Sequence, residues 1–202
     1  MGQPATSVKH LWVCLHGYGQ IGEIFARRFE KWNQPEHLFL IPEGPHRFYL
    51  QGTEGHVGAS WMTKVDRLND IEDQFSYLEG LTTKIGSQLH AGVSIHVLGF
   101  SQGVATALRW IDQTKLKIHS LICWAGTFPP DIDYKLRQQQ FAGINFHACF
   151  GDEDEFISMK KAKEMLQQLQ DQQIEVQPHY YKGGHKMFDA LLDELIRSCE
   201  DQ

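Results

Sequence analysis

The sequence predicts an α/β protein with a mostly parallel sheet, because short apolar runs alternate with longer segments of helical periodicity. The last such segment shows the spacing clearly: Met187, Leu191 and Leu195 fall on one helical face, and Asp189 and Asp193 lie off it. The length of 202 residues fits one compact domain that buries a core without disulfides or metals. We therefore expect a single domain over residues 1–202.

The strands are predicted where apolar and β-branched residues run together between polar or turn-forming residues. These segments are 10–16, 37–42, 94–100, 119–126, 144–151 and 174–181. The helices are predicted at 21–33, 66–90, 102–113, 131–141, 156–170 and 186–199.

Residues 43–65 fit neither pattern and are expected to form a long irregular loop. Loops of this length inside a compact domain are typically functional or disordered. The segment carries Phe48, Tyr49 and Trp61, which are of the type found buried, so disorder is not expected.

The composition argues against nucleic acid or an anionic membrane as a partner. The chain has 19 basic and 25 acidic residues, which gives a formal net charge of −6. No stretch approaches the roughly 18 apolar residues of a membrane span, and residues 1–10 lack the apolar core of a signal peptide. The four cysteines have no CxxC spacing and read as small core residues in a reducing compartment. We expect a cytoplasmic protein without stable membrane insertion.

The strongest functional signal is GFSQG at residues 99–103, a GxSxG between a predicted strand and a predicted helix. A sharp turn there presents the Ser101 hydroxyl above the sheet edge and aims the Gln102 amide at a developing oxyanion. In a chance match, Ser101 is only a helix N-cap. The flanking strand and helix favour a nucleophile.

The sequence HGYG at residues 16–19 ends the first predicted strand. Its glycines let the chain fold back so that the Tyr18 amide supplies a second oxyanion donor. His16 fits better as a hydrogen-bonding brace of this turn than as a base. Alone, the motif is also compatible with an ordinary turn at a strand end.

Serine chemistry needs a base, and His185 is the best placed of the 11 histidines. It follows two glycines after the last predicted strand, so it lies at the same sheet edge as Ser101 and after it in the chain. A carboxylate from the acidic run 152–155 is expected to orient its imidazole. Both Asp152 and Asp154 follow the strand, and the run also fits a solvated helix start.

HGYG, GFSQG, GDEDEFI and GGH, in this order over nearly the whole chain, resemble the carboxylesterase branch that includes acyl-protein thioesterases and lysophospholipases. The resemblance implies an α/β-hydrolase fold with a doubly wound sheet, no large cap domain and no cofactor. It also implies a triad of Ser101, Asp154 and His185, with the backbones of Tyr18 and Gln102 as the oxyanion hole.

Three features depart from the thioesterase pattern. Val104 stands where a further glycine usually follows GFSQG, and residues 155–158 lack the prolines that usually follow the triad acid. Of the thioesterase pattern in residues 43–65, only the final Ser60-Trp61 is present. Together with the absent cap, these departures predict a preference for short or medium acyl chains.

The predicted function is a serine hydrolase that cleaves carboxylic esters or thioesters through an acyl-enzyme. Apolar side chains near the motifs are expected to wall the substrate pocket, although core packing is an equal alternative for each. These are Phe48, Tyr49, Trp61, Met62, Phe128, Phe156 and Met187. The expected partner is a small-molecule ester or thioester substrate.

Two other functions compete with this prediction. The first is a binding protein on the same scaffold that has lost catalysis, because fold alone does not settle function. The second is a metallohydrolase, which is weaker because the histidines show no HExxH or similar spacing.

Overall fold

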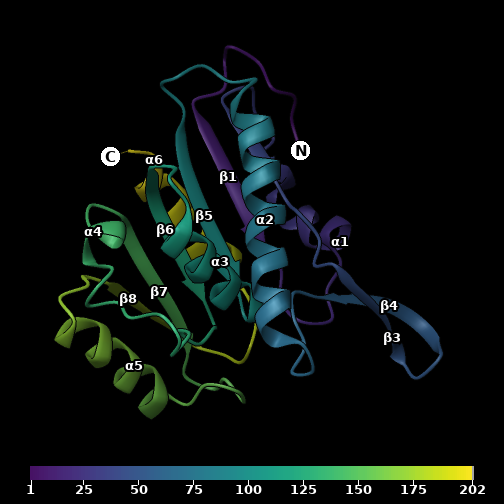
Figure 1. Ribbon diagram of the computed structural model, residues 1–202, viewed down its shortest axis with the longest axis vertical. Coiled ribbons are helices and arrows are strands. Elements are labelled where there is room, and N and C mark those ends of the chain that lie inside the picture. The colour runs from purple at the N-terminus through teal and green to yellow at the C-terminus, as the bar shows by residue number, and fades with distance from the viewer. Residues whose placement is uncertain (202) are drawn as a thin grey trace.

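The computed structural model describes residues 1–201, in which six parallel strands form one sheet with helices on both faces (Figure 1). The strand order is β2-β1-β5-β6-β7-β8. In that order the strands are His37–Leu40, His10–Leu15, Ser94–Phe100, Ile118–Trp124, Asn145–Gly151 and Gln177–Tyr181. All six predicted strands are present, and the predicted α/β class is confirmed.

The helices divide between the two faces of the sheet. One face carries α2 (Arg67–Gly86), α3 (Gln102–Gln113), the short α4 (Gln138–Phe141) and α5 (Met159–Asp171). The other face carries α1 (Gly22–Ala26), the 3₁₀ helix η1 (Arg27–Trp32) and α6 (Asp189–Glu200). Among residues 1–201, no helix combines the length and apolar character that crossing a membrane requires.

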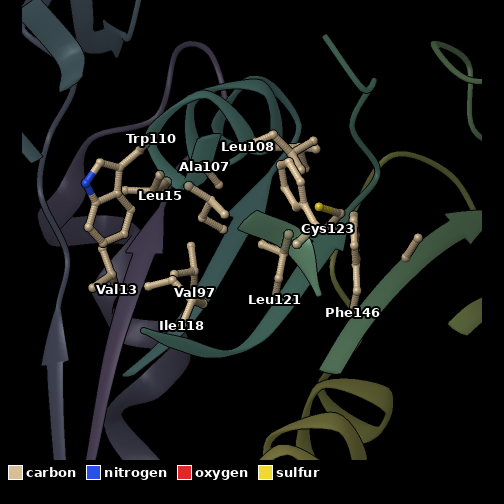
Figure 2. Packing of buried hydrophobic residues seen from close by; sticks show 14 of the residues in the cluster. Val13, Leu15, Val97, Ala107, Leu108, Trp110, Ile118, Leu121, Cys123 and Phe146 are labelled. Atoms are coloured by element: carbon tan, nitrogen blue, oxygen red, sulfur yellow. The ribbon is translucent and has the colours of Figure 1, made fainter. Parts of the chain in front are cut away.

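Successive side chains of each strand point to opposite faces of the sheet, so the core consists of two apolar clusters. In β1, Val13 and Leu15 point into one cluster, and Trp12 and Cys14 point into the other. Figure 2 shows the first cluster, in which side chains of α3 such as Trp110 cover the central strands. The four cysteines are unpaired and buried, as predicted for core residues.

Residues 43–65 do not form the irregular loop that the sequence predicts. They contain a hairpin of β3 (His46–Gln51) and β4 (Glu54–Ser60), which projects away from the main sheet (Figure 1). Its turn contains Gly52 with φ 64°. Most hairpin side chains are exposed, so its strands lack the apolar runs by which the others are recognised.

The predicted helix at 131–141 is also mostly absent, since only α4 is helical there. The Asp131 carboxylate accepts hydrogen bonds from Arg109 and Arg67, and the Asp133 side chain caps the Leu136 amide. These side-chain bonds hold turns in place of a continuous helix.

Candidate active site

Ser101 occupies a strained turn between the end of β5 and the start of α3. Its φ of 55° and ψ of −116° lie in a region that residues with a side chain rarely adopt. The Ser101 amide donates to the Trp124 carbonyl at 2.8 Å, which ties the turn to β6. A Cβ on Gly103 would overlap the Leu15 carbonyl oxygen, and one on Gly99 would lie 2.6 Å from the Gly103 oxygen. The glycines of the motif thus allow strand and helix to approach closely.

The side chains of Ser101, His185 and Asp154 form one hydrogen-bonded chain. Ser101 Oγ lies 2.8 Å from His185 Nε2, and His185 Nδ1 lies 2.8 Å from Asp154 Oδ2. Because the carboxylate accepts from Nδ1–H, Nε2 is left to accept the proton of the Ser101 hydroxyl. The three residues follow β5, β8 and β7, whose carboxyl ends meet at one edge of the sheet.

The structure brings Asp154, and not Asp152, against His185. The Asp154 side chain is 1% exposed, and its Oδ1 accepts from the amides of Phe156 at 2.8 Å and Ile157 at 3.0 Å. Asp152 is exposed and accepts from the Gly183 amide at 2.9 Å. Asp152 therefore holds the loop that carries His185.

Glu155 also supports this loop, which sequence reasoning missed. Its Oε2 accepts a hydrogen bond from the His185 amide at 3.3 Å. The Glu153 amide donates to the Gly183 carbonyl at 3.1 Å, so the loops after β7 and β8 are joined at several points. In the sequence Glu155 is one of four acids in a row, and nothing distinguishes it.

Two backbone amides beside Ser101 match the expected oxyanion donors. Within residues 1–201, the amides of Tyr18 and Gln102 donate to no protein group. The amides next to Tyr18 are both used: Gly17 donates to Gln20 Oε1 and Gly19 to the Ala59 carbonyl, each at 2.8 Å. The Tyr18 amide is therefore left open for a ligand at the sheet edge.

His16 supports the turn at residues 16–19 through hydrogen bonds, as its position in the sequence predicts. It is buried; its Nδ1 donates to the Gly17 carbonyl at 2.7 Å, and its Nε2 accepts from the Gly44 amide at 2.9 Å. Burial lowers the pKa of His16, which favours the neutral ring that these two bonds require.

The Gln102 side chain joins the nucleophile turn to the end of the β3–β4 hairpin. Its Oε1 accepts from the Trp61 amide at 3.0 Å. Its Nε2 donates to Ser60 Oγ at 3.0 Å and to the Met62 carbonyl at 3.1 Å. The sequence assigned only the backbone of Gln102 to the site, because the GFSQG pattern does not show which groups its side chain contacts.

The side chains predicted to wall the pocket lie in different environments. Trp61 and Met187 are buried in the core, and Phe128 packs on Phe146 and Phe150. Met62 is half-buried and accepts from Arg109 through its sulfur.

Three other predicted aromatics lie at the surface or near it. The Phe48 ring stacks on Tyr18 with centroids 5.0 Å apart, and Tyr49 is exposed on the hairpin. Phe156 is 73% exposed, and its ring centroid lies 4.7 Å from that of His185.

A hollow of about 940 Å³ lies at the opposite end of the strands from Ser101, where His96, His119 and Asn145 line it. A smaller one of about 580 Å³ lies beside the hairpin, against Phe48, Tyr49 and Val57. Neither is lined by Ser101 or His185. The catalytic geometry and not cavity size identifies the candidate site.

Comparisons with known proteins identify the family and the fold. The family model described as Phospholipase/Carboxylesterase matches residues 2–200. No curated protein matches the chain.

Similar solved structures include acyl-protein thioesterase 2 of Zea mays, at 20% identity and a TM-score of 0.78, over 98% of this chain and 96% of that one. Esterase PE8 is 23% identical with a TM-score of 0.75, over 98% of this chain and 96% of its own. SOBER1 of Arabidopsis thaliana is 17% identical with a TM-score of 0.72, over 95% and 97%. These structures share the fold of this chain.

Proposed function

The chain belongs to the phospholipase/carboxylesterase family of α/β-hydrolases, and we propose that it cleaves carboxylic esters or thioesters through an acyl-enzyme on Ser101. The observation that carries the proposal is the hydrogen-bonded chain from Ser101 Oγ through His185 to Asp154, with both distances 2.8 Å. An unassisted serine hydroxyl is a poor nucleophile near neutral pH, and this arrangement supplies the base that it needs.

In the first half of the reaction, Ser101 Oγ attacks the carbonyl carbon while His185 Nε2 takes the hydroxyl proton. The negative charge moves to the carbonyl oxygen, where the Tyr18 and Gln102 amides stabilise it. Asp154 orients the imidazole and stabilises the imidazolium. His185 then gives the proton to the leaving alcohol or thiol as its bond to the carbon breaks.

In the second half, water attacks the acyl group on Ser101, and His185 takes a proton from that water. The tetrahedral intermediate collapses, His185 returns the proton to Ser101 Oγ, and the carboxylic acid leaves. The free enzyme is regenerated with all protons accounted for.

A fluorophosphonate probe tests whether Ser101 is activated, because it labels only a nucleophilic serine. We expect the wild type to be labelled and to hydrolyse p-nitrophenyl acetate. Ser101→Ala should lose labelling and at least about 10³-fold in kcat. Ser76→Ala, which changes an exposed serine on α2, is the matched control and should behave as the wild type. An unlabelled, inactive wild type would instead indicate a binding protein on this scaffold.

We also propose a preference for short or medium acyl chains. Trp61 and Met187 are taken up by core packing, and the exposed aromatics Tyr18 and Phe156 stand around the rim of the site. An apolar tunnel would add about 0.8 kcal/mol for each methylene buried, and kcat/KM would rise steadily with chain length. With p-nitrophenyl esters of two to sixteen carbons, we expect kcat/KM to stop rising at medium length. A rise that continues to sixteen carbons would contradict this preference.

A further inference from the structure

Phe156 holds a position that core packing does not explain. Its ring lies edge-on to the His185 imidazole, with centroids 4.7 Å apart and an interplanar angle of 68°, yet the residue is 73% exposed. A large apolar side chain left in water gains little free energy from burial. Most of the ring is therefore available to a molecule that approaches His185.

The backbone of Phe156 is fixed by the same carboxylate that holds the imidazole. Its amide donates to Asp154 Oδ1 at 2.8 Å, and Asp154 Oδ2 lies 2.8 Å from His185 Nδ1. The backbone that carries the ring is thus fixed beside His185, and the ring itself packs on the imidazole.

The strand order shows on which side of Ser101 this ring lies. Tyr18 follows β1, Ser101 follows β5 and Phe156 follows β7, so Tyr18 and Phe156 stand on opposite sides of the nucleophile. The oxyanion is expected on the Tyr18 side. The leaving group must lie within hydrogen-bond reach of His185 Nε2, because that atom returns the proton to it. Phe156 consequently borders the leaving group and not the oxyanion.

We propose that Phe156 is a specificity-determining residue that stacks on the leaving group and favours esters or thioesters whose alcohol or thiol carries an aromatic ring next to the scissile bond. The inference rests on the proposed function, since it needs the acyl-enzyme on Ser101. Aromatic pairs contribute beyond the area that they bury, and the exposed Phe156 face offers such a partner. The contact acts in acylation only, because the leaving group has departed before water attacks.

Two acetate esters with alcohols of similar acidity test the inference, benzyl acetate and methyl acetate. Both give the same acetyl-enzyme, so a difference between them reports the leaving-group side alone. We expect Phe156→Ala to lower kcat/KM for benzyl acetate by about 5- to 10-fold relative to methyl acetate, the size of one aromatic contact. Phe156→Trp should retain the preference. Tyr180→Ala, which removes an exposed aromatic on β8, is the matched control and should leave the ratio unchanged.

The hydrolysis rate of the acetyl-enzyme separates this role from simple support of the imidazole. We expect Phe156→Ala to leave that rate unchanged. An equal fall for both esters and for deacylation would show that Phe156 only positions His185, and an unchanged ratio would also overturn the inference. Hydrolysis of both esters by Ser101→Ala at the wild-type rate would refute the proposed function itself, whatever the result at Phe156.

Discussion

Asp154 connects the loop after β7 to His185, because its two carboxylate oxygens bind different partners. Oδ1 accepts from the Phe156 and Ile157 amides, and Oδ2 faces His185. The first set fixes the carboxylate, and the second transmits its position to the imidazole. An acid held only by its bond to His185 would leave the ring free to turn.

Replacing the two aspartates of this loop by asparagine distinguishes their roles. Asp154→Asn supplies no charge for the imidazolium and favours the wrong tautomer of His185, so we expect a loss in kcat of up to about 10⁴-fold. Asp152→Asn should keep most activity and lower the free energy of unfolding by about 1 kcal/mol, since its bond to the Gly183 amide weakens. Steady-state kinetics and urea unfolding measure both effects. If Asp152→Asn lost the more activity while folded, the assignment of the acid would be wrong.

Among the elements, the β3–β4 hairpin forms a sheet of its own and contacts the rest of the molecule through loops and helices. One such contact is the bridge between Gln20 and Ala59, and another is the set of hydrogen bonds from the Gln102 side chain to residues 60–62. Because Gln102 directly follows Ser101, the position of the hairpin end is coupled to the nucleophile turn.

Gln102→Leu tests this coupling, since it preserves the size of the side chain and removes its hydrogen bonds. We expect amide hydrogen exchange at residues 59–62 to accelerate at least about tenfold, which corresponds to about 1.4 kcal/mol of local stability. Catalysis should weaken as the Gln102 backbone loses its anchor. Gln113→Leu, at the exposed end of the same helix, is the control. Wild-type exchange rates at 59–62 in Gln102→Leu would show that the hairpin end is held by other contacts.

The elements that could be predicted from the sequence are those with one buried face. The six strands of the main sheet and α3 show clear apolar patterns because the core selects their side chains. The hairpin was missed because its side chains are mostly exposed. Residues 131–137 were predicted as helix because their pattern does not reveal that Asp131 pairs with Arg109, a residue distant in sequence.

The candidate site was predictable to the extent that motifs encode it. Ser101, His185 and Asp154 were named from motif context and family resemblance, and the structure places them within hydrogen-bond reach. Their catalytic roles stay a prediction until tested. The contributions of Glu155 and the Gln102 side chain depend on loops meeting in three dimensions, which no local pattern reports. Burial of Trp61 and Met187 was equally hidden, because an apolar residue suits either a pocket or a core.

At the scale of the whole molecule, histidines gather on the strands far from Ser101. His10 Nδ1 and His96 Nε2 lie 3.1 Å apart across β1 and β5, and His147 Nδ1 and His179 Nε2 lie 3.0 Å apart across β7 and β8. Each contact needs one nitrogen without a proton. Burial lowers the pKa of His96 to about 3 and that of His147 to about 4.

These lowered pKa values predict that the protein loses stability in mild acid. In the unfolded chain both histidines take up protons below about pH 6.5, whereas in the folded chain they stay neutral until about pH 3 to 4. The unfolded state then binds more protons, and the free energy of unfolding falls by about 1.4 kcal/mol per pH unit for each histidine.

Urea unfolding at pH 7 and pH 5 measures this slope. The double variant His96→Gln, His147→Gln has no proton to take up at either position, so between pH 7 and pH 5 its stability should fall by about 2 kcal/mol less per pH unit than that of the wild type. His56→Gln changes an exposed histidine and should keep the wild-type slope. An unchanged slope in the double variant would mean that other groups govern acid sensitivity.

The strand order also determines how the chain can acquire its structure during synthesis. β1 pairs with β2 on one side and with β5 on the other. The pairing of His10 with Ser94 can therefore form only after β5 has been synthesised. Until residues 94–100 leave the ribosome, one edge of an apolar strand has no partner, and nascent chains with such edges aggregate readily. Bringing β5 to β1 closes a long loop, and the entropy cost of this closure precedes the stabilising contacts between the two strands. Docking of β5 onto β1 is the strand pairing of the main sheet that closes the longest loop, and chains released before residue 100 lack the strand that joins the two halves of the sheet.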